Sequence, residues 1–309
     1  MAVFNSQRTY GVEIEFHSSM HSQDIADAIN DGFRTDGISN TCRYVGYDHR
    51  TTSNWKIVHD GSVSRGWELV SPPLSGVDGF EEIRSAVKTL VELGCSVSTQ
   101  TGLHVHHDGQ NLSGRAIGQV FGIYASYQTL IDYMVSPSRR TTRGYAKRLN
   151  WDRLTKNGTE KFTKDDRKEA ITKIRREHGC RHESNCRCGA RYHAVNILSI
   201  LQHGTIEFRQ HQGSLNATRI INWILLTQSI IEASRERRSI PKPGNVAGLK
   251  DHNGVFYRFR KSIKIYAPWN EGATKEDCQP YVDAFAYWNK RIKRFSKAAG
   301  VDINEVASN

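Results

Sequence analysis

Long hydrophobic runs and a disulfide framework are both missing from this sequence. No stretch approaches the roughly 20 apolar residues that a membrane-spanning helix requires, and the mean hydropathy of −0.58 is typical of a water-soluble globular chain. The six cysteines among 309 residues do not resemble the framework of a secreted disulfide-rich protein. The N-terminal residues lack the basic and then apolar order of a signal peptide. We therefore expect a cytoplasmic protein that does not enter a membrane.

Three short stretches, 11–17, 102–108 and 205–211, alternate apolar side chains with side chains that bind metals or phosphate. Side chains on a strand change faces at every residue, so each stretch predicts a strand with one buried face. On a shared sheet, the other face would collect these groups: Glu13, Glu15, His17, His104, His106, Glu207, Arg209 and His211. A face of this composition indicates a site for metal ions and phosphate.

The rest of the chain reads as strands mixed with helices. Residues 55–59 and 66–70 predict one hairpin, and residues 191–201 and 205–210 predict a later one. Apolar spacing predicts helices elsewhere, including a long one that begins after Ser113. Repeats, low-complexity linkers and regular βαβ alternation are absent from the sequence. This organisation favours an α+β fold around an antiparallel sheet.

Six short blocks carry a resemblance: GVEIEF at 11–16, DGS at 60–62, ELVSPPL at 68–74, TGLHVH at 101–106, RYHAVN at 191–196 and IEFRQ at 206–210. Together they resemble the amidoligase family, which belongs to the carboxylate–amine ligase superfamily of glutamine synthetase and glutamate–cysteine ligase. No single block is specific, but six blocks in the order of the family are.

The resemblance implies a glutamine-synthetase-like α+β fold, in which helices flank a curved and mainly antiparallel sheet. It predicts a single catalytic domain over 1–309 with its core at about 10–235. A basic insertion rich in Cys and His at about 150–190 and a basic helical region at 236–309 do not match the family. We expect these two segments to bear on the substrate rather than on the chemistry.

The resemblance also implies the reaction. In this superfamily the sheet binds ATP with two or three Mg²⁺ or Mn²⁺ ions. The γ-phosphate passes to a substrate carboxylate, and an amine then displaces phosphate from the acyl phosphate to give an amide and ADP. The expected carboxylate is that of Glu or Asp, as a free amino acid or within a peptide. Such phosphoryl transfer depends on charge neutralisation and positioning more than on covalent help from the protein.

Five residues would hold the metal ions by similarity to the superfamily. Glu13 and Glu15 lie roughly 6.6 Å apart along one strand face, a spacing that suits two carboxylates on neighbouring ions. They would be divided between two metal sites, with Glu68 on the first and Glu207 on the second, and His104 matches the metal-binding histidine. The alternative for the strand residues is the solvated face of an ordinary edge strand.

Three further assignments concern the phosphates and the amine. His106 matches the histidine nearer the nucleotide phosphates, and Arg209 would hold the transferring phosphoryl group through its planar guanidinium. Asp60 would position or deprotonate the amine, so that Arg209, Asp60 and Glu207 form the catalytic set. The alternatives are an exposed charge pair between Glu207 and Arg209, and a plain turn at Asp60.

Two groups of residues fall outside the resemblance or at its margin. A tract of His178, Cys180, His182, Cys186 and Cys188 could supply the four ligands of a structural Zn²⁺ site, although its spacing is not that of a zinc finger. The alternative is a basic loop with reduced thiols.

The second group consists of Arg139, Arg140 and Arg143, which follow the long helix. The family places a Ser-Arg element near the substrate there, so one of these arginines could clamp a substrate carboxylate. The alternative is a solvated basic face.

The net charge of +11 predicts a polyanionic ligand or partner, such as an acidic protein or a nucleic acid. The alternative is that this positive charge only keeps the protein soluble and attracts ATP. The charge and the Cys/His tract also support a competing function, that of a nucleic-acid-binding protein or a metal-dependent nuclease. A third possibility is a degenerate family member that only senses ATP, and the complete Glu, His and Arg set disfavours it. The sequence does not define the oligomeric state.

Overall fold

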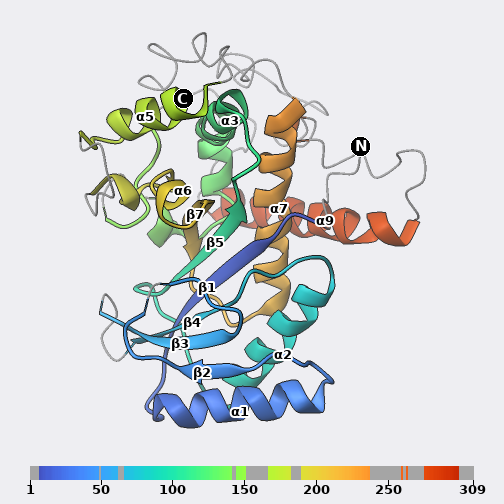
Figure 1. Cartoon of the computed structure of the whole chain (residues 1–309). Coiled ribbons are helices and arrows are strands. Elements are labelled where there is room, and N and C mark those ends of the chain that lie inside the picture. Colours follow the sequence, from blue (N-terminus) through green and yellow to red (C-terminus); the bar gives the residue numbers. More distant parts are fainter. Residues whose placement is uncertain are drawn as a thin grey trace. The chain divides into compact units, whose positions relative to one another are not determined.

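The computed structural model describes residues 7–48, 50–61, 66–140, 144–150, 166–181, 189–236, 259, 262–263 and 275–298 (Figure 1). The chain divides into two compact units. The first unit comprises 6–108 and 207–224, and the second comprises 1–5, 109–206 and 225–309. The prediction of a single catalytic domain with its core at about 10–235 stays a prediction.

The first unit is built on a mainly antiparallel sheet, which confirms the predicted α+β class. Neighbouring strands of this unit follow the order β2-β3-β4-β1-β5-β7. The β3–β4, β4–β1 and β1–β5 pairs are antiparallel, and the β2–β3 pair is parallel. The strands are β1 (Tyr10–His17), β2 (Cys42–Tyr44), β3 (Trp55–Asp60), β4 (Gly66–Val70), β5 (Gly102–Asp108) and β7 (Thr205–Gln212).

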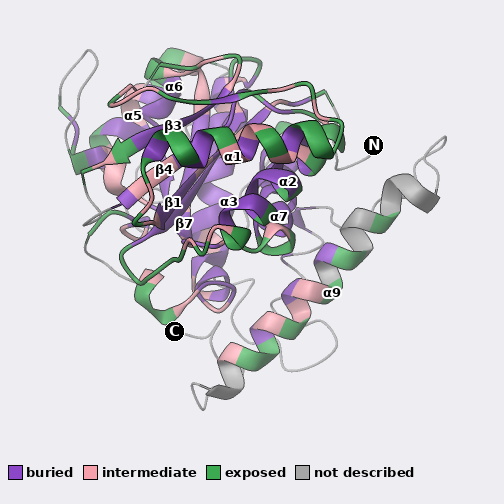
Figure 2. Ribbon diagram, turned by 90° about the horizontal axis from the view of Figure 1, so that it is seen from below, coloured by how far each residue is buried: buried purple, intermediate pink, exposed green. Residues whose placement is uncertain are grey.

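One face of this sheet is apolar and is covered by two helices, α1 (Ser22–Thr35) and α2 (Asp78–Glu92) (Figure 1). Val12, Ile14 and Phe16 of β1 are each at most 1% exposed on that face. Buried and exposed residues alternate along α1, as its amphipathic sequence requires (Figure 2). Burial of these side chains removes apolar surface from water and is the main stabilising term of the unit.

The two helices approach each other closely at Gly32. A Cβ atom built on Gly32 would lie 2.5 Å from Oγ1 of Thr89 on α2, closer than real Cβ contacts. Only glycine leaves room for this approach without a shift of the Thr89 side chain or of the helix that carries it.

The cross-strand register determines which side chains share the other, polar face. Glu13 of β1 lies directly opposite His104 of β5, and Glu15 of β1 lies directly opposite Glu68 of β4. Directly opposite residues of an antiparallel pair project to the same face of the sheet. The predicted hairpin of residues 55–59 and 66–70 is confirmed as β3 and β4.

The second unit is mainly helical in its described residues. The helix predicted after Ser113 is confirmed, because the Ser113 side chain accepts a hydrogen bond from the Ala116 N–H at 3.2 Å. The elements of this unit are α3 (Gly114–Asp132), η1 (Pro137–Arg139), α5 (Arg167–Glu177), η2 (Gly189–Tyr192), β6 (Val195–Asn196), α6 (Ser199–Gln202) and α9 (Lys275–Ala298). Helix α7 (Ala217–Glu236) has residues in both units.

The late hairpin predicted for 191–201 and 205–210 is confirmed only in part, because its first arm is a strand beside β7 at Val195–Asn196 alone. Residues 191–201 form the end of η2, the two-residue strand β6 and the start of α6. The side-chain oxygen of Asn196 accepts a hydrogen bond from the Leu198 N–H at 2.9 Å. This local bond turns the backbone out of the strand after Asn196, which is a characteristic effect of asparagine.

Within the described ranges, no helix combines the length and apolar character needed to cross a membrane.

Candidate metal and phosphate site

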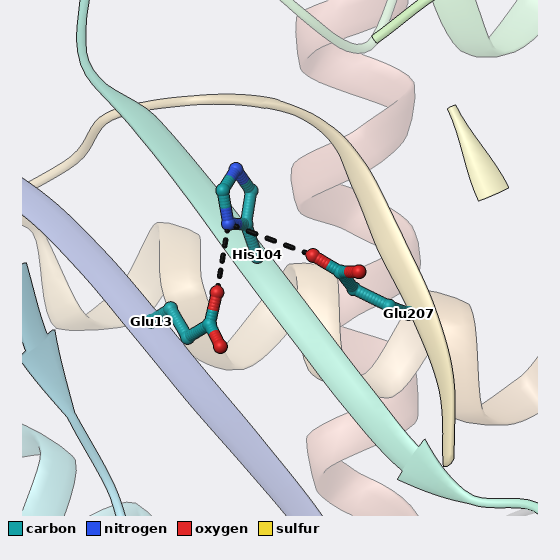
Figure 3. Close-up of side chains that lie close together, drawn as sticks. All are labelled: Glu13, His104 and Glu207. Atoms are coloured by element: carbon teal, nitrogen blue, oxygen red, sulfur yellow. Dashed lines mark hydrogen bonds and ion pairs between the residues drawn. The ribbon is translucent and has the colours of Figure 1, made fainter. Parts of the chain in front are cut away.

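The first cluster on the polar face joins three strands of the first unit (Figure 3). His104 Nδ1 lies 2.9 Å from a carboxylate oxygen of Glu13 and 3.7 Å from a carboxylate oxygen of Glu207. The possible ligand atoms of the three residues all lie within 4.8 Å of one another. Two carboxylates and one imidazole at this spacing can bind one divalent cation.

A second cluster uses the other edge of the same imidazole. His104 Nε2 lies 3.4 Å from a carboxylate oxygen of Glu15. Glu15, Glu68 and His104 offer ligand atoms within 4.8 Å of one another. The second carboxylate oxygen of Glu15 accepts a hydrogen bond from the Gly102 N–H at 2.6 Å, which holds the side chain in place. The structure thus groups Glu207 with Glu13, and Glu68 with Glu15.

The charges around these carboxylates move their pKa values in opposite directions. Burial would raise the pKa of Glu13, but His106 and His104 hold that pKa well below its ordinary value. Burial also opposes ionisation of Glu207, and Arg209 and His106 nevertheless lower its pKa. The pKa of Glu68 is raised well above its ordinary value by burial and by the carboxylates of Glu13, Glu15 and Asp60. Near Glu68, the negative charge of the carboxylates on the polar face therefore exceeds the positive charge of the neighbouring basic side chains.

The two residues predicted to bind phosphate, His106 and Arg209, border the first cluster. His106 Nε2 lies 3.2 Å from Glu13 and 3.8 Å from Glu207. Burial alone would lower the pKa of His106, but the carboxylates of Glu13 and Glu207 raise it. Arg209 donates to Glu207 in a partly buried ion pair. His106 and Arg209 thus bring positive charge to the side of the cluster that Glu207 occupies.

Asp60 lies at the end of β3, directly opposite Gly66 of β4 and on the same face as Glu68. Sequence reasoning missed Lys56, which lies four residues earlier on this face and is 2% exposed. Its ammonium group donates to the carbonyl oxygens of Asp48 at 2.7 Å and of Arg50 at 2.6 Å. Burial lowers the pKa of Lys56. The sequence offered one signal for this residue. Lys56 and Asp60 are an even number of positions apart on one predicted strand, so their side chains project to the same face.

The three arginines proposed for the substrate carboxylate belong to the second unit. Arg139 ends η1. The guanidinium carbon of Arg140 lies 4.9 Å from the ring centre of Tyr133 and 5.4 Å from that of Phe295, and burial lowers its pKa. Arg143 lies outside the described residues. The substrate role of these arginines stays a prediction.

Two members of the Cys/His tract are described. The ring of His178 is buried, and its centre lies 4.0 Å from that of His193 and 5.6 Å from that of Phe121. Cys180 is also buried, and its sulfur accepts a hydrogen bond from the guanidinium of Arg175 at 3.8 Å. His182, Cys186 and Cys188 lie outside the described residues. A zinc site in this tract stays a prediction.

This chain is similar to one protein family in sequence and to several solved proteins in structure. A family model described as "Putative amidoligase enzyme" matches residues 6–231. A solved bifunctional glutathione synthetase from Pasteurella multocida is 12% identical with a TM-score of 0.44, and the match covers 98% of this chain and 51% of that one. This chain therefore spans about half the length of the glutathione synthetase.

A solved complex of the prokaryotic ubiquitin-like protein Pup with its ligase PafA is 11% identical with a TM-score of 0.37. That match covers 97% of this chain and 67% of the other one. Among curated proteins, no sequence matches this chain.

Proposed function

We propose that this chain, which belongs to the amidoligase family, is an ATP-dependent carboxylate–amine ligase that forms an amide or isopeptide bond. The observation that carries the proposal is the pair of carboxylate clusters that share His104, with Arg209 beside one of them. The γ-phosphoryl group of ATP would pass to a substrate carboxylate. The amine would then form the C–N bond as the C–O bond to phosphate breaks, with release of phosphate and ADP.

The residues of the two clusters fit hard divalent cations such as Mg²⁺ or Mn²⁺. Their donors are carboxylate oxygens and one imidazole, and the first cluster includes the buried carboxylate of Glu207. Glu13, Glu207 and His104 would hold one ion, and the carboxylates of Glu15 and Glu68 would hold another, because a neutral imidazole has one lone pair and can ligate only one of the two ions. Bound cations would supply charge neutralisation for the phosphates of ATP. The raised pKa of Glu68 fits this proposal, because a cation would relieve the repulsion among the carboxylates.

Arg209 and His106 would act on the phosphates. The rigid guanidinium of Arg209 can bind two phosphoryl oxygens at once, which a lysine cannot do. The pair with Glu207 orients Arg209 before ATP binds, so little reorganisation is needed during the reaction. His106, whose pKa is raised, would place a second positive group beside the same phosphates.

Asp60 would accept the proton that the amine loses when it attacks. It lies on the polar face, two cross-strand rows beyond Glu68, because the intervening His59–Trp67 row projects to the other face. This places a carboxylate at the opposite end of the metal clusters from His106, which faces Gly11 of β1. The proposed order along β1 is therefore nucleotide phosphates, metal ions and amine.

A screen for ADP release tests the proposal. Purified enzyme with ATP and Mg²⁺ should release ADP only when both a carboxylate and an amine are present, and amino acids, polyamines and acidic peptides form the panel. With hydroxylamine as the amine, the acyl phosphate should be trapped as a hydroxamate. Release of AMP and pyrophosphate, or hydroxamate formation without ATP, would contradict the mechanism. Cleavage of DNA or RNA without ATP hydrolysis would favour the nuclease alternative.

A further inference from the structure

We propose that helix α9 positions the segment that carries the predicted substrate arginines, with Arg291 and Phe295 as positioning residues for the carboxylate substrate. This inference rests on the proposed function, and it concerns a helix that lies beyond the family match at residues 6–231. Its basis is a set of contacts between α9 and the residues that follow α3, all within the second unit.

The first contacts lie at the C-terminal end of α3. This helix has no basic residue in its last turn, although the carbonyl oxygens at a helix C-terminus lack intrahelical partners and carry partial negative charge. Two arginines from outside the helix bind consecutive carbonyls there. Nε of Arg291 donates to the Met134 carbonyl at 2.8 Å, and Nη2 of Arg140 donates to the Val135 carbonyl at 3.1 Å. These cations stabilise the turn in which α3 ends.

One aromatic ring of α9 joins the two arginines. The guanidinium carbon of Arg291 lies 4.9 Å from the centre of the Phe295 ring, and that of Arg140 lies 5.4 Å from the same centre. Tyr133 supplies a second ring, whose centre lies 4.9 Å from the guanidinium carbon of Arg140. A guanidinium over an aromatic ring is attracted by the negative face of the π system. Phe295 thus links a cation of α9 to a cation of the segment after α3.

An apolar face fixes α9 itself. Ala284, Trp288 and Ile292 recur at a spacing of four residues and are each at most 2% exposed. Residues four positions apart lie on the same face of a helix, and exposed residues alternate with this buried face along α9 (Figure 2). Arg291 and Phe295 therefore project from a helix that burial holds in place.

These contacts set the position of the predicted substrate segment. Its first residue, Met134, is bound by α9 through Arg291, and its last, Arg140, stacks on α9 through Phe295. Between them η1 forms a tight turn, in which the Arg139 N–H donates to the Ser136 carbonyl at 2.9 Å. A short turn that one helix holds at both ends has little conformational freedom left. The position of Arg139 therefore depends on α9.

The contacts also divide the roles of the predicted arginines. Arg140 already binds a carbonyl and two rings, and burial lowers its pKa, so it acts as a positioning residue rather than as the clamp. A guanidinium that binds a carboxylate through two parallel hydrogen bonds tolerates little displacement. Loosening of α9 should therefore weaken carboxylate binding. The two metal clusters belong to the first unit, and their affinity should not change.

Hydrogen–deuterium exchange of the full chain measures the positioning directly. Arg291→Met removes the donor to Met134, and Phe295→Leu keeps an apolar side chain but loses the π face. In both variants the amides of residues 133–140 should exchange about tenfold faster than in the wild type, as for loss of a hydrogen bond to a charged group. Arg294→Met is the matched control, because Arg294 is exposed on the same helix. Arg294→Met and Phe295→Tyr, which keeps the ring, should exchange like the wild type.

Kinetics of the same variants test the effect on the substrate. The probe is L-glutamate or, where the wild type does not use it, triglutamate, with hydroxylamine as the amine and hydroxamate as the product. In Arg291→Met and Phe295→Leu the KM for this carboxylate should rise about tenfold, while kcat and the KM for ATP stay within about twofold. A fall in kcat at constant KM would indicate a merely structural role. That result, or unchanged amide exchange in both variants, would overturn the inference.

Manganese binding separates this inference from the proposed function. Electron paramagnetic resonance of added Mn²⁺ should report equal affinity in the wild type and in Arg291→Met. Intact Mn²⁺ binding and hydroxamate formation with an unchanged carboxylate KM would refute the role of α9 alone. A wild type that neither binds Mn²⁺ nor forms hydroxamate with ATP would refute the proposed function, and with it the substrate role of α9. Loss of Mn²⁺ binding in Arg291→Met would show a global effect of the substitution and overturn the inference.

Discussion

His104 lies with its Nδ1 atom 2.9 Å from the carboxylate of Glu13, the residue directly opposite it across the β1–β5 pair. Its Nε2 atom lies 3.4 Å from Glu15, two residues further along the same strand. One buried imidazole thus contacts both consecutive carboxylates of β1. Any change at His104 should therefore affect both candidate metal clusters, whereas a change at Glu207 should affect one.

The first prediction concerns these ligands. His104→Ala and Glu207→Gln should each abolish substrate-dependent ADP release, because loss of a ligand typically removes several kcal/mol of transition-state stabilisation. The apolar face of the sheet is untouched, so the circular dichroism spectrum should not change. Glu81→Gln on α2, whose partner is the neighbouring Arg84, is the matched control and should retain activity. Activity within a few-fold of wild type would remove the tested residue from the site.

The second prediction concerns the pH dependence of stability. The folded-state pKa of Glu68 is raised above its ordinary value of 4.5 by burial and by the neighbouring carboxylates. The native state therefore keeps this proton longer than the unfolded state, and its contribution to stability is lost as pH rises from 4.5 through the raised pKa. Without metal, the melting temperature of Glu68→Gln relative to wild type should increase over that window.

Added Mg²⁺ provides the control for this experiment. It should raise the melting temperature of wild-type protein near neutral pH more than that of Glu68→Gln, because only the wild type has the carboxylate that binds it. A melting-temperature difference that stays constant with pH would show that Glu68 titrates normally.

The third prediction concerns Arg209. Arg209→Lys keeps the positive charge but loses the planar group that matches phosphoryl oxygens. ATP binding should persist, and turnover should fall by roughly two to three orders of magnitude, as when one preorganised transition-state donor is lost. Equilibrium binding of a labelled ATP analogue and the rate of ADP release measure the two effects separately. An equal loss of binding and turnover would indicate that Arg209 acts in ground-state binding.

The fourth prediction concerns the close approach of α1 and α2. Gly32→Ala should destabilise the first unit by about 1–3 kcal/mol, because the new Cβ atom would meet Oγ1 of Thr89. Helix propensity alone predicts the opposite sign, a gain of up to about 1 kcal/mol. The double variant with Thr89→Ala should recover part of the loss in urea denaturation. Additive effects of the two substitutions would contradict the contact.

The fifth prediction concerns zinc. If the Cys/His tract binds a structural ion, the purified protein should contain about one zinc per chain, and Cys186→Ser should release it and lower stability. Elemental analysis and thermal unfolding measure the two quantities. A zinc-free protein of full stability would leave His178 and Cys180 as ordinary buried side chains.

Much of the candidate site could be predicted from the sequence because strand alternation is a local property. The parity of Glu13 and Glu15, of His104 and His106, and of Glu207 and Arg209 predicted one polar face, and the structure brings these groups together. The β3–β4 hairpin and the helix after Ser113 were predictable for the same reason. Periodicity, turn residues and caps act within a few positions along the chain.

The tertiary structure decided what depends on register between distant strands. Alternation along β1 does not indicate that Glu15 faces Glu68, that Glu13 faces His104, or that a single imidazole contacts both glutamates. The first arm of the late hairpin is shorter than predicted because the side-chain bond of Asn196 ends the strand locally. The burial of Lys56 depends on carbonyl groups of a loop that packs onto β3. The sequence by itself thus determined the composition of the polar face. Its pairing required the folded sheet, because burial of the apolar face against α1 and α2 specifies the register between strands that are distant in the sequence.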